Sequence, residues 1–287
     1  MIKLEQVGYV YMEGGPFEKT ALKNINLTIN RGEFIGLIGH TGSGKSTLIQ
    51  MLNGLLKPTS GSIFIDGKEL GAKGTNMRQI RFDVGLVMQY PEYQLFEETV
   101  AKDIAFGPTN MGLSAEEVEG RVKFAANMVG LKEELLSKSP FDLSGGQKRR
   151  AAIAGVLAME PKVLILDEPT AGLDPAGRDE ILYKIKDMHE RMDMTVILVS
   201  HSMEDIAKLA DRILVMNQGE VAMFDKTDAV FSRGEELTRM GLNIPQITHI
   251  ADELRKQGVP LEDGIYTVED AYRQLGSFLL SKGEEQC

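Results

Sequence analysis

The nine residues GHTGSGKST, Gly39 to Thr47, have the types and spacing of a phosphate-binding loop. They fit the pattern G-x-x-x-x-G-K-[ST], with the apolar run FIGLI before them and a helical pattern after them. In such a strand, loop and helix, backbone amides and the positive end of the helix face a bound phosphate. The alternative is a glycine-rich turn that only joins strand to helix, and the flanking pattern argues against it.

The residues of this loop have separate expected roles. The amides from Gly42 to Ser46 are expected to point at the β-phosphate of a nucleotide, and Lys45 to reach its β- and γ-phosphates. The Ser46 hydroxyl is expected to coordinate Mg²⁺, which bridges the same two phosphates. His40 occupies a free position in the pattern and only lines the loop. The expected nucleotide-binding residues here are Gly39, His40, Thr41, Gly42, Ser43, Gly44, Lys45, Ser46 and Thr47.

Two adjacent acids, Asp167 and Glu168, follow the apolar run VLIL. A buried strand that ends at Asp167 would hold this carboxylate beside Mg²⁺. Glu168 points elsewhere and is the candidate for positioning and polarising the attacking water, because that role needs an acceptor near the γ-phosphate but off the metal. The alternative for the pair is a solvated strand end, and the phosphate loop in the same chain argues against it.

A histidine and a glutamine follow two further apolar runs. His201 follows TVILVS, and its imidazole is expected to hydrogen-bond the γ-phosphate and to orient Glu168. A lone histidine is more often structural, but a strand terminus in register with two acids favours a role in the site. Gln89 ends VGLVMQ, where its amide oxygen is expected to complete the Mg²⁺ shell, contact the water and couple the site to the following helices. The predicted catalytic residues are Glu168, His201, Lys45 and Gln89, and the predicted metal ligands are Ser46, Gln89 and Asp167.

A second segment suited to phosphate, LSGGQ, lies much later in the chain. Ser144, Gly145, Gly146 and Gln147 stand at the start of a helical run, where amides can meet the γ-phosphate from the side opposite the first loop. If the helical region that carries them projects away from its own phosphate loop, one subunit cannot close its own site. The expected geometry is therefore two subunits facing head to tail, each completing the site of the other.

The flanking periodicity predicts an α/β P-loop fold whose parallel strands carry these residues. Alternating apolar residues in MIKLEQVGYVY and at Ile25, Leu27 and Ile29 predict an N-terminal antiparallel β subdomain. The run 213–216, turning into 221–224, predicts a closing hairpin.

Three segments follow from this pattern. Residues 1–227 are predicted to form a nucleotide-binding domain, with an α-helical insert over about 92–160. Residues 228–287 change to short amphipathic helices and are predicted to form a C-terminal helical extension. This extension either packs on its own domain or contacts a dimer partner.

Charge and composition exclude several classes of protein. The chain has 287 residues and a net charge of −10, which argues against a nonspecific grip on nucleic acid. The apolar runs are too short to cross a bilayer, so any membrane role is expected to be peripheral. The N-terminus lacks the layout of a secretory signal, so we expect the mature protein to start here. The one cysteine, Cys287, can form no intrachain disulfide, which fits a reducing cytoplasm.

In this order and spacing, GHTGSGKS, Gln89, LSGGQ, LILDE, AGLD and His201 resemble the nucleotide-binding subunit of an ABC transporter over roughly residues 1–225. The resemblance implies an ATPase that uses ATP and Mg²⁺. It also implies that Tyr11 stacks on adenine, with Phe17 as a weaker candidate, and that Asp174 ends the loop that crosses between subunits. The commoner ABC form has serine where Ala171 stands, so that residue departs from the family pattern.

A narrower resemblance involves GGPFEKTAL, QYPEYQLFEETVAKDIAFGPTNMG, LSGGQKRRAAIAGVLAM and PTAGLDPAGR. These segments are similar to the ATPases of energy-coupling factor importers of vitamins and metals, most of all to the second of two paralogous ATPases. The resemblance implies a heterodimer with the first paralogue, with a homodimer as the alternative. It implies docking on coupling helices of a membrane T-component, which holds a substrate-binding S-component, and a peripheral place at the cytoplasmic face of the cell membrane.

The acids Glu92, Glu97 and Glu98 then have two interpretations. They either receive arginines of the T-component, since carboxylate and guanidinium pair bidentately, or form only an exposed acidic loop.

Three other functions are the alternatives. A soluble ABC ATPase acting on nucleic acid or ribosomes usually has two cassettes or a long coiled coil, and the contiguous motifs fit neither. A nonenzymatic nucleotide-gated regulator would lack the base, yet Glu168 is present. The ATPase of a conventional ABC importer would differ in the membrane subunit that it binds.

Overall fold

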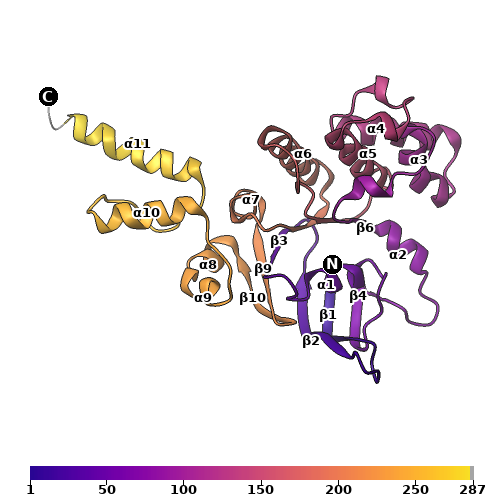
Figure 1. Ribbon diagram of the computed structural model, residues 1–287, viewed down its shortest axis with the longest axis horizontal. Coiled ribbons are helices and arrows are strands. Elements are labelled where there is room, and N and C mark those ends of the chain that lie inside the picture. The colour runs from indigo at the N-terminus through magenta and orange to yellow at the C-terminus, as the bar shows by residue number, and fades with distance from the viewer. Residues whose placement is uncertain (285–287) are drawn as a thin grey trace.

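The computed structural model describes residues 1–284, which form two sheets flanked by helices (Figure 1). Cys287 lies outside the described residues. The first sheet is antiparallel, with four strands in the order β2-β1-β4-β5. Its strands are β1 (Ile2–Tyr11), β2 (Lys19–Ile29), β4 (Ser60–Ile65) and β5 (Lys68–Glu69). The prediction of an N-terminal antiparallel sheet is confirmed.

The second sheet contains six strands in the order β10-β9-β3-β8-β7-β6. Its strands are β3 (Phe34–Ile38), β6 (Val84–Val87), β7 (Val163–Asp167), β8 (Thr195–Val199), β9 (Arg212–Asn217) and β10 (Glu220–Lys226). All neighbours from β9 to β6 are parallel, and β10 returns antiparallel to β9 as the predicted hairpin. The carboxyl ends of the parallel strands therefore meet at one edge, where β3, β7 and β8 deliver the phosphate loop, the two acids and His201.

Helices connect the parallel strands, as parallel pairing requires. They are α1 (Lys45–Leu52) after β3, α2 (Met77–Asp83) before β6, α6 (Pro175–Met192) between β7 and β8, and α7 (Met203–Leu209) between β8 and β9. Figure 1 shows α6 and α7 on the side of the sheet away from β1, β2 and β4.

Each face of the parallel sheet has its own apolar core. In β8, Val196 and Leu198 pack in the core that includes the helical insert and α6, whereas Ile197 and Val199 pack with the antiparallel sheet and α1. A parallel strand buried on both faces must be apolar throughout, which explains why TVILV does not alternate. The two cores hold the strands in place and so fix the loops at their carboxyl edge.

The helical insert lies at one end of the molecule (Figure 1). It consists of α3 (Val100–Met111), α4 (Ala115–Met128) and α5 (Gly145–Leu157), with short 3₁₀ turns η1 (Pro91–Gln94), η2 (Glu133–Leu135) and η3 (Pro140–Asp142). Polar side chains cap each α-helix at its start, since the first amides lack partners within the helix. Thr99 caps α3, and Ser114 and Ser144 each form a reciprocal capping box.

The C-terminal helices divide into two pairs. The pair α8 (Thr227–Phe231) and α9 (Gly234–Arg239) packs on the core of the parallel sheet through Phe231 and Leu237. The pair α10 (Gln246–Lys256) and α11 (Val268–Glu284) has a small core of its own and extends away from the sheets as an arm (Figure 1). A domain limit at residue 227 stays a prediction.

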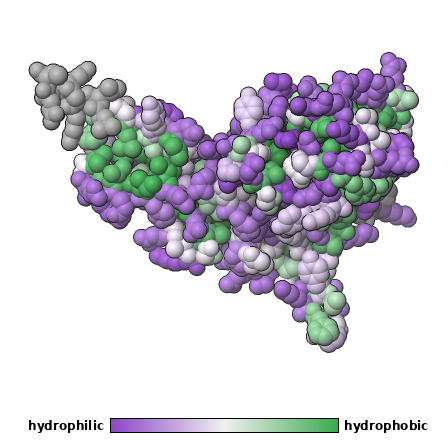
Figure 2. All heavy atoms as spheres, turned by 45° about the horizontal axis from the view of Figure 1, so that its top comes forward, coloured by the Kyte–Doolittle hydropathy of each residue, from purple (hydrophilic) through white to green (hydrophobic). Residues whose placement is uncertain are grey.

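Apolar surface gathers on the C-terminal arm (Figure 2), where Ile250 and Val268 are exposed. Across residues 1–284, no helix is both long enough and apolar enough to cross a membrane.

Candidate functional site

A pocket of about 430 Å³ opens at the carboxyl edge of the parallel sheet. It is lined by Tyr11, Lys19, Thr20, Ala21, Thr41, Gly42, Gly44, Lys45, Ser46, Thr47, Gln89, Asp167, Glu168 and His201. The fold therefore brings together the loop after β3, the two acids after β7 and the polar residues after β6 and β8. The described strands β6 and β8 end two residues before Gln89 and His201, so both side chains lie on short loops rather than at strand ends.

The phosphate loop is shaped by its contact with the antiparallel sheet. Gly44 has φ +106°, and a side chain there would come within 2.9 Å of the Ala21 carbonyl oxygen. Only glycine allows this backbone conformation and this close approach together. The loop therefore sits against β2, and β2 contributes Lys19, Thr20 and Ala21 to the pocket wall.

Lys45 is held inside the loop by backbone carbonyls. Its Nζ donates to the carbonyl oxygens of Gly39 at 2.6 Å and His40 at 3.2 Å. Burial lowers the pKa of the Lys45 ammonium, while the nearby carboxylates of Glu168 and Asp167 raise it. The carbonyls of the phosphate loop therefore hold the Lys45 ammonium at the pocket, where the same loop would bind a phosphate.

Two carboxyl groups of different surroundings face this ammonium. Burial raises the pKa of Asp167 against the lowering effects of Lys45 and His201. Burial also raises the pKa of Glu168, His201 lowers it, and Asp167 raises it further. Glu168 Oε1 lies 2.9 Å from His201 Nε2, so the imidazole contacts the carboxylate that it was expected to orient.

The backbone of Glu168 is held in an unusual conformation. Its φ is +52°, and its amide donates to the Val199 carbonyl at 3.0 Å. A non-glycine residue in this region costs about 1–3 kcal/mol and persists only where the surroundings hold it, often at functional sites. The bend after Asp167 is what turns Glu168 away from the direction of the strand.

Tyr11 borders the pocket beside α1. Its hydroxyl lies 3.1 Å from the Thr47 hydroxyl, and its ring packs edge-on against Tyr9. Phe17 is 78% exposed and does not line the pocket. Lys19 and Thr20 also line the pocket, although no motif indicated them. They lie there because β2 pairs antiparallel with β1, with Thr20 opposite Val10 and Lys19 opposite Tyr11.

Several predicted nucleotide-binding residues lie outside this pocket. Gly39, His40 and Ser43 form the back of the loop, where the Ser43 side chain is fully buried and His40 contacts Thr41 and Asn217. Ser144, Gly145, Gly146 and Gln147 begin α5, and Asp174 caps α6 by accepting from the Gly177 amide at 2.7 Å. The chain therefore does not bring LSGGQ or Asp174 to its own pocket.

Glu92 already has an arginine partner within this chain, and docking of the three acids on arginines of a T-component stays a prediction. The Glu92 carboxylate accepts from Arg149 Nη2 at 2.9 Å and from Arg149 Nε at 3.2 Å. Glu98 pairs with Lys102 one helical turn away, on a fully exposed surface. Arg149 lies 57 residues from Glu92 in sequence, so the motifs alone could not reveal this pairing.

The comparisons with known proteins agree with this architecture. The family model described as ABC transporter matches residues 22–171. The chain is 60% identical to the energy-coupling factor transporter ATP-binding protein EcfA2 of Clostridium acetobutylicum, over 96% of each chain. It is 58% identical to the EcfA2 protein of Caldanaerobacter subterraneus, over 97% of each chain.

Two solved structures share its fold. One is cbiO1 from Clostridium perfringens, described as part of the ABC transporter complex cbiONQ, with 41% identity, a TM-score of 0.74 and coverage of 88% of this chain and 98% of that one. The other is the cassette MJ0796 as a dimer in a post-hydrolysis state with ADP and Pi, with 33% identity, a TM-score of 0.72 and coverage of 79% and 99%. The chain belongs to the ABC transporter family and, within it, to the energy-coupling factor transporter ATP-binding proteins of the EcfA2 type.

Proposed function

We propose that this chain hydrolyses ATP at the interface of a head-to-tail dimer and thereby drives uptake of vitamins or metal ions by an energy-coupling factor importer. The observation that carries the proposal is a divided site. One pocket gathers the phosphate loop, Asp167, Glu168 and His201, whereas the LSGGQ segment lies outside it in the same chain. The pocket lacks the helix start that LSGGQ would supply, and LSGGQ lacks the phosphate loop and the acids of the pocket.

The pocket residues suit the charge of a nucleoside triphosphate. The amides of Gly42 to Ser46 at the start of α1 and the Lys45 ammonium would neutralise the β- and γ-phosphates. Tyr11 would offer its ring to adenine, and Thr47 is already in contact with the Tyr11 hydroxyl.

The oxygen donors of the pocket fit a magnesium ion. The Ser46 hydroxyl, the Asp167 carboxylate and the Gln89 amide all line it, and Mg²⁺ is bound through few protein oxygens together with phosphates and water. When bound, the ion would neutralise charge on the β- and γ-phosphates.

Glu168 is the candidate base for hydrolysis. Burial raises the pKa of its carboxyl, which makes the carboxylate a better proton acceptor, and contact with His201 fixes its direction. His201 would then donate to the γ-phosphate oxygen as charge develops there. Without either residue the attacking water lacks an oriented acceptor.

Closure of the site requires a second subunit. The Ser144 amide donates to Gln147 Oε1 at 3.0 Å, whereas the amides of Gly145 and Gly146 lie in the first turn of α5, where a helix offers them no backbone partner. There they would meet the γ-phosphate bound by a facing chain. The partner is a paralogous ATPase in a heterodimer, with a second copy of this chain as the alternative. Asp174 lies on the loop that would cross between the two chains.

Transport requires membrane partners. We infer that the dimer docks on coupling helices of a T-component, that the S-component is reached only indirectly, and that the chain is a peripheral protein at the cytoplasmic face. The EcfA2 relatives are described as energy-coupling factor transporter proteins, which supports this assignment over that of a conventional importer.

Affinity isolation of the full-length chain from detergent-solubilised membranes tests the proposal. We expect a second ATPase and a T-component to co-purify, and the complex to hydrolyse ATP. Recovery of a permease pair of the conventional importer type instead would overturn the energy-coupling factor assignment.

A further inference from the structure

The guanidinium of Arg149 is buried within α5, two residues after Gln147. Only 3% of its side chain is exposed. A cation at this depth requires an acceptor for its N–H donors and a countercharge, because removing it from water is costly. Its Nε and Nη2 donate to the Glu92 carboxylate, and its Nη1 donates to the Pro169 carbonyl at 3.3 Å and to the Ala171 carbonyl. The Tyr90 ring lies 6.0 Å from the guanidinium.

The partners of Arg149 stand next to two residues of the proposed hydrolytic site. Glu92 belongs to η1, three residues after Gln89, and Pro169 directly follows Glu168. These contacts reach 57 and 20 residues along the chain. One side chain of the signature helix therefore links the segment that carries Gln89 to the turn that carries Glu168.

This link acts on a backbone that needs support. Glu168 has φ +52°, and the Ala171 amide donates to the Glu168 carbonyl at 3.2 Å to close the turn. Such a conformation persists only when its surroundings hold it. By binding the carbonyls of Pro169 and Ala171, the guanidinium holds two peptide groups of the turn that follows Glu168.

We propose that Arg149 is a positioning residue for ATP hydrolysis, which holds Glu168 and Gln89 in a fixed relation to the signature helix. Arg149 does not line the nucleotide pocket, so it acts through its neighbours rather than on ATP. When α5 moves as a partner subunit closes, the guanidinium carries η1 and the turn after Glu168 with it. The inference rests on the proposed function, because it matters only if Glu168 acts on ATP.

A lysine cannot reproduce these contacts. The guanidinium presents five donors in a planar fork, which pairs with a carboxylate through two nitrogens and leaves Nη1 for the carbonyls. An ammonium keeps the charge but is a point donor at the end of a flexible chain. Arg149→Lys therefore keeps the positive charge and removes the hydrogen bonds to Glu92 and to the carbonyls that depend on the shape of the guanidinium.

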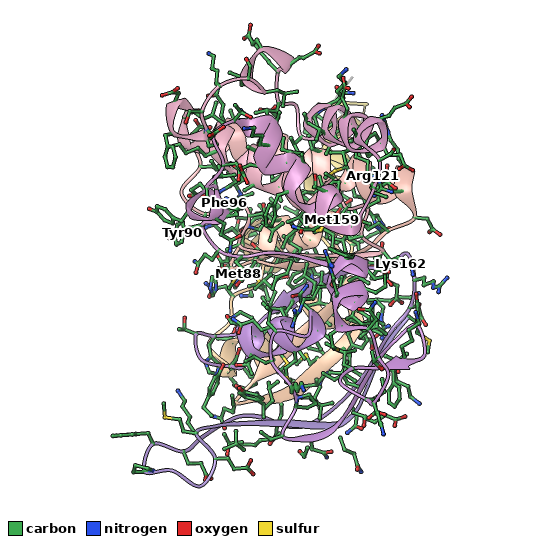
Figure 3. The ribbon with its side chains drawn as sticks, turned by 90° about the vertical axis from the view of Figure 1, so that its right-hand side faces the viewer. Met88, Tyr90, Phe96, Arg121, Met159 and Lys162 are labelled. Carbon is green, nitrogen blue, oxygen red and sulfur yellow. The ribbon has the colours of Figure 1, made fainter. Side chains whose placement is uncertain are left out.

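Arg121 offers a matched control elsewhere in the insert. On α4, its Nη2 pairs with Glu160 at 3.1 Å and its Nη1 donates to the Ala158 carbonyl at 3.3 Å. It thus has the same kinds of partner, a carboxylate and a carbonyl. Figure 3 shows Arg121 and Tyr90 on opposite sides of the view, so Arg121 is away from the segment after Gln89.

The experiment compares five chains in the purified transporter complex: wild type, Arg149→Lys, Arg121→Lys, Glu92→Gln and the double variant Arg149→Lys/Glu92→Gln. Steady-state ATP hydrolysis gives kcat and KM, and binding of a nonhydrolysable ATP analogue gives nucleotide affinity. Thermal unfolding checks that each variant is folded. Glu92→Gln serves if Arg149→Lys does not fold, because it breaks the same link from the other side.

We expect kcat to fall about 10- to 100-fold in Arg149→Lys and in Glu92→Gln, because misplacing catalytic groups by about 1 Å has effects of this size. The analogue affinity should stay within about twofold of wild type, as expected when only the transition state is affected. The double variant should be no slower than the slower single one, since both break one link. Arg121→Lys loses the same kinds of contact away from the hydrolytic residues, so its kcat should stay close to wild type.

The inference is overturned if Arg149→Lys and Arg121→Lys reduce kcat equally, or if the loss appears in KM alone. Failure of the proposed function looks different. In that case wild type itself would hydrolyse no ATP, or Glu168→Gln would hydrolyse it at the wild-type rate.

Discussion

The Glu168 carboxylate and the His201 imidazole lie 2.9 Å apart at the carboxyl edge of the parallel sheet. The contact follows from strand order, because β7 and β8 are neighbours and Asp167 pairs with Val199. Each residue comes shortly after its strand ends, so two positions far apart in sequence become adjacent. The proposed hydrolysis depends on this adjacency.

Glu168→Gln should stop turnover while ATP still binds. The amide keeps the size of the side chain but cannot accept a proton, and general-base contributions are about 10²- to 10⁴-fold. We expect kcat to fall within that range in a steady-state ATPase assay, with the dimer held closed. Glu190→Gln, on the exposed part of α6, is the control and should hydrolyse normally. Near-normal turnover by Glu168→Gln would place the base elsewhere.

The acid limb of the rate profile should reflect the surroundings of Glu168. Burial raises the pKa of this carboxyl above its ordinary value of 4.5, and hydrolysis needs the ionised form. The rate should therefore fall, as pH decreases, at a higher pH than for an ordinary glutamate. The charge interaction with His201 lowers the pKa of Glu168, so His201→Ala should move the acid limb of kcat further toward neutral pH. His249→Ala, on α10, is the control, and an unmoved limb in His201→Ala would contradict the account.

Tyr11→Ala should weaken ATP binding, because stacking of a base on an aromatic ring is worth about 1–3 kcal/mol. Tyr11→Phe keeps the ring and loses only the contact with Thr47, so its affinity should stay close to wild type. Phe17→Ala is the comparison, since Phe17 lies outside the pocket. Calorimetric titration with ATP measures all three. A larger loss in Phe17→Ala than in Tyr11→Ala would reverse the assignment.

Asp66 should stabilise the fold except at strongly acid pH. Burial raises its pKa, but hydrogen bonds and charge interactions with the N-terminal amine and Arg31 outweigh this and lower it from 3.8 to about 2. Because the folded form binds its proton more weakly than the unfolded chain, the stabilisation is present above about pH 4 and is lost as pH falls toward 2.

Asp66→Asn should therefore lower Tm at pH 7 by a few degrees, and the difference from wild type should shrink as the pH falls through that window. Thermal unfolding followed by circular dichroism across this range measures it. An equal difference in Tm at every pH would show that charge is not the cause.

The parallel sheet could be predicted from local patterns because its strands are buried on both faces. FIGLI, VLIL and VILV have no polar side chain, and each leads into polar residues that need the carboxyl edge. The phosphate loop is equally local, since its glycines and Lys45 act within one turn. Such features depend on neighbours in sequence, and the sequence therefore indicates them.

Features that depend on distant packing could not be predicted in this way. The Arg149 contacts with Glu92 and Pro169 join α5, η1 and the turn after β7, and no sequence spacing predicts them. Thr20 enters the pocket through strand register with Val10 rather than through a motif. The sharing of α8 and α9 with the main core likewise depends on how Phe231 packs.

The central claim is that one nucleotide is enclosed by two chains, and Gly145 allows a direct test of it. A methyl group at Gly145 would meet no atom within 4 Å, so Gly145→Ala should leave the chain itself undisturbed. Analytical ultracentrifugation of a Glu168→Gln chain with its ATPase partner should show association on addition of ATP. Adding Gly145→Ala should abolish that association while ATP still binds to the separate chain. Association that is unchanged by Gly145→Ala, or full ATP turnover by a strictly monomeric chain, would contradict the account.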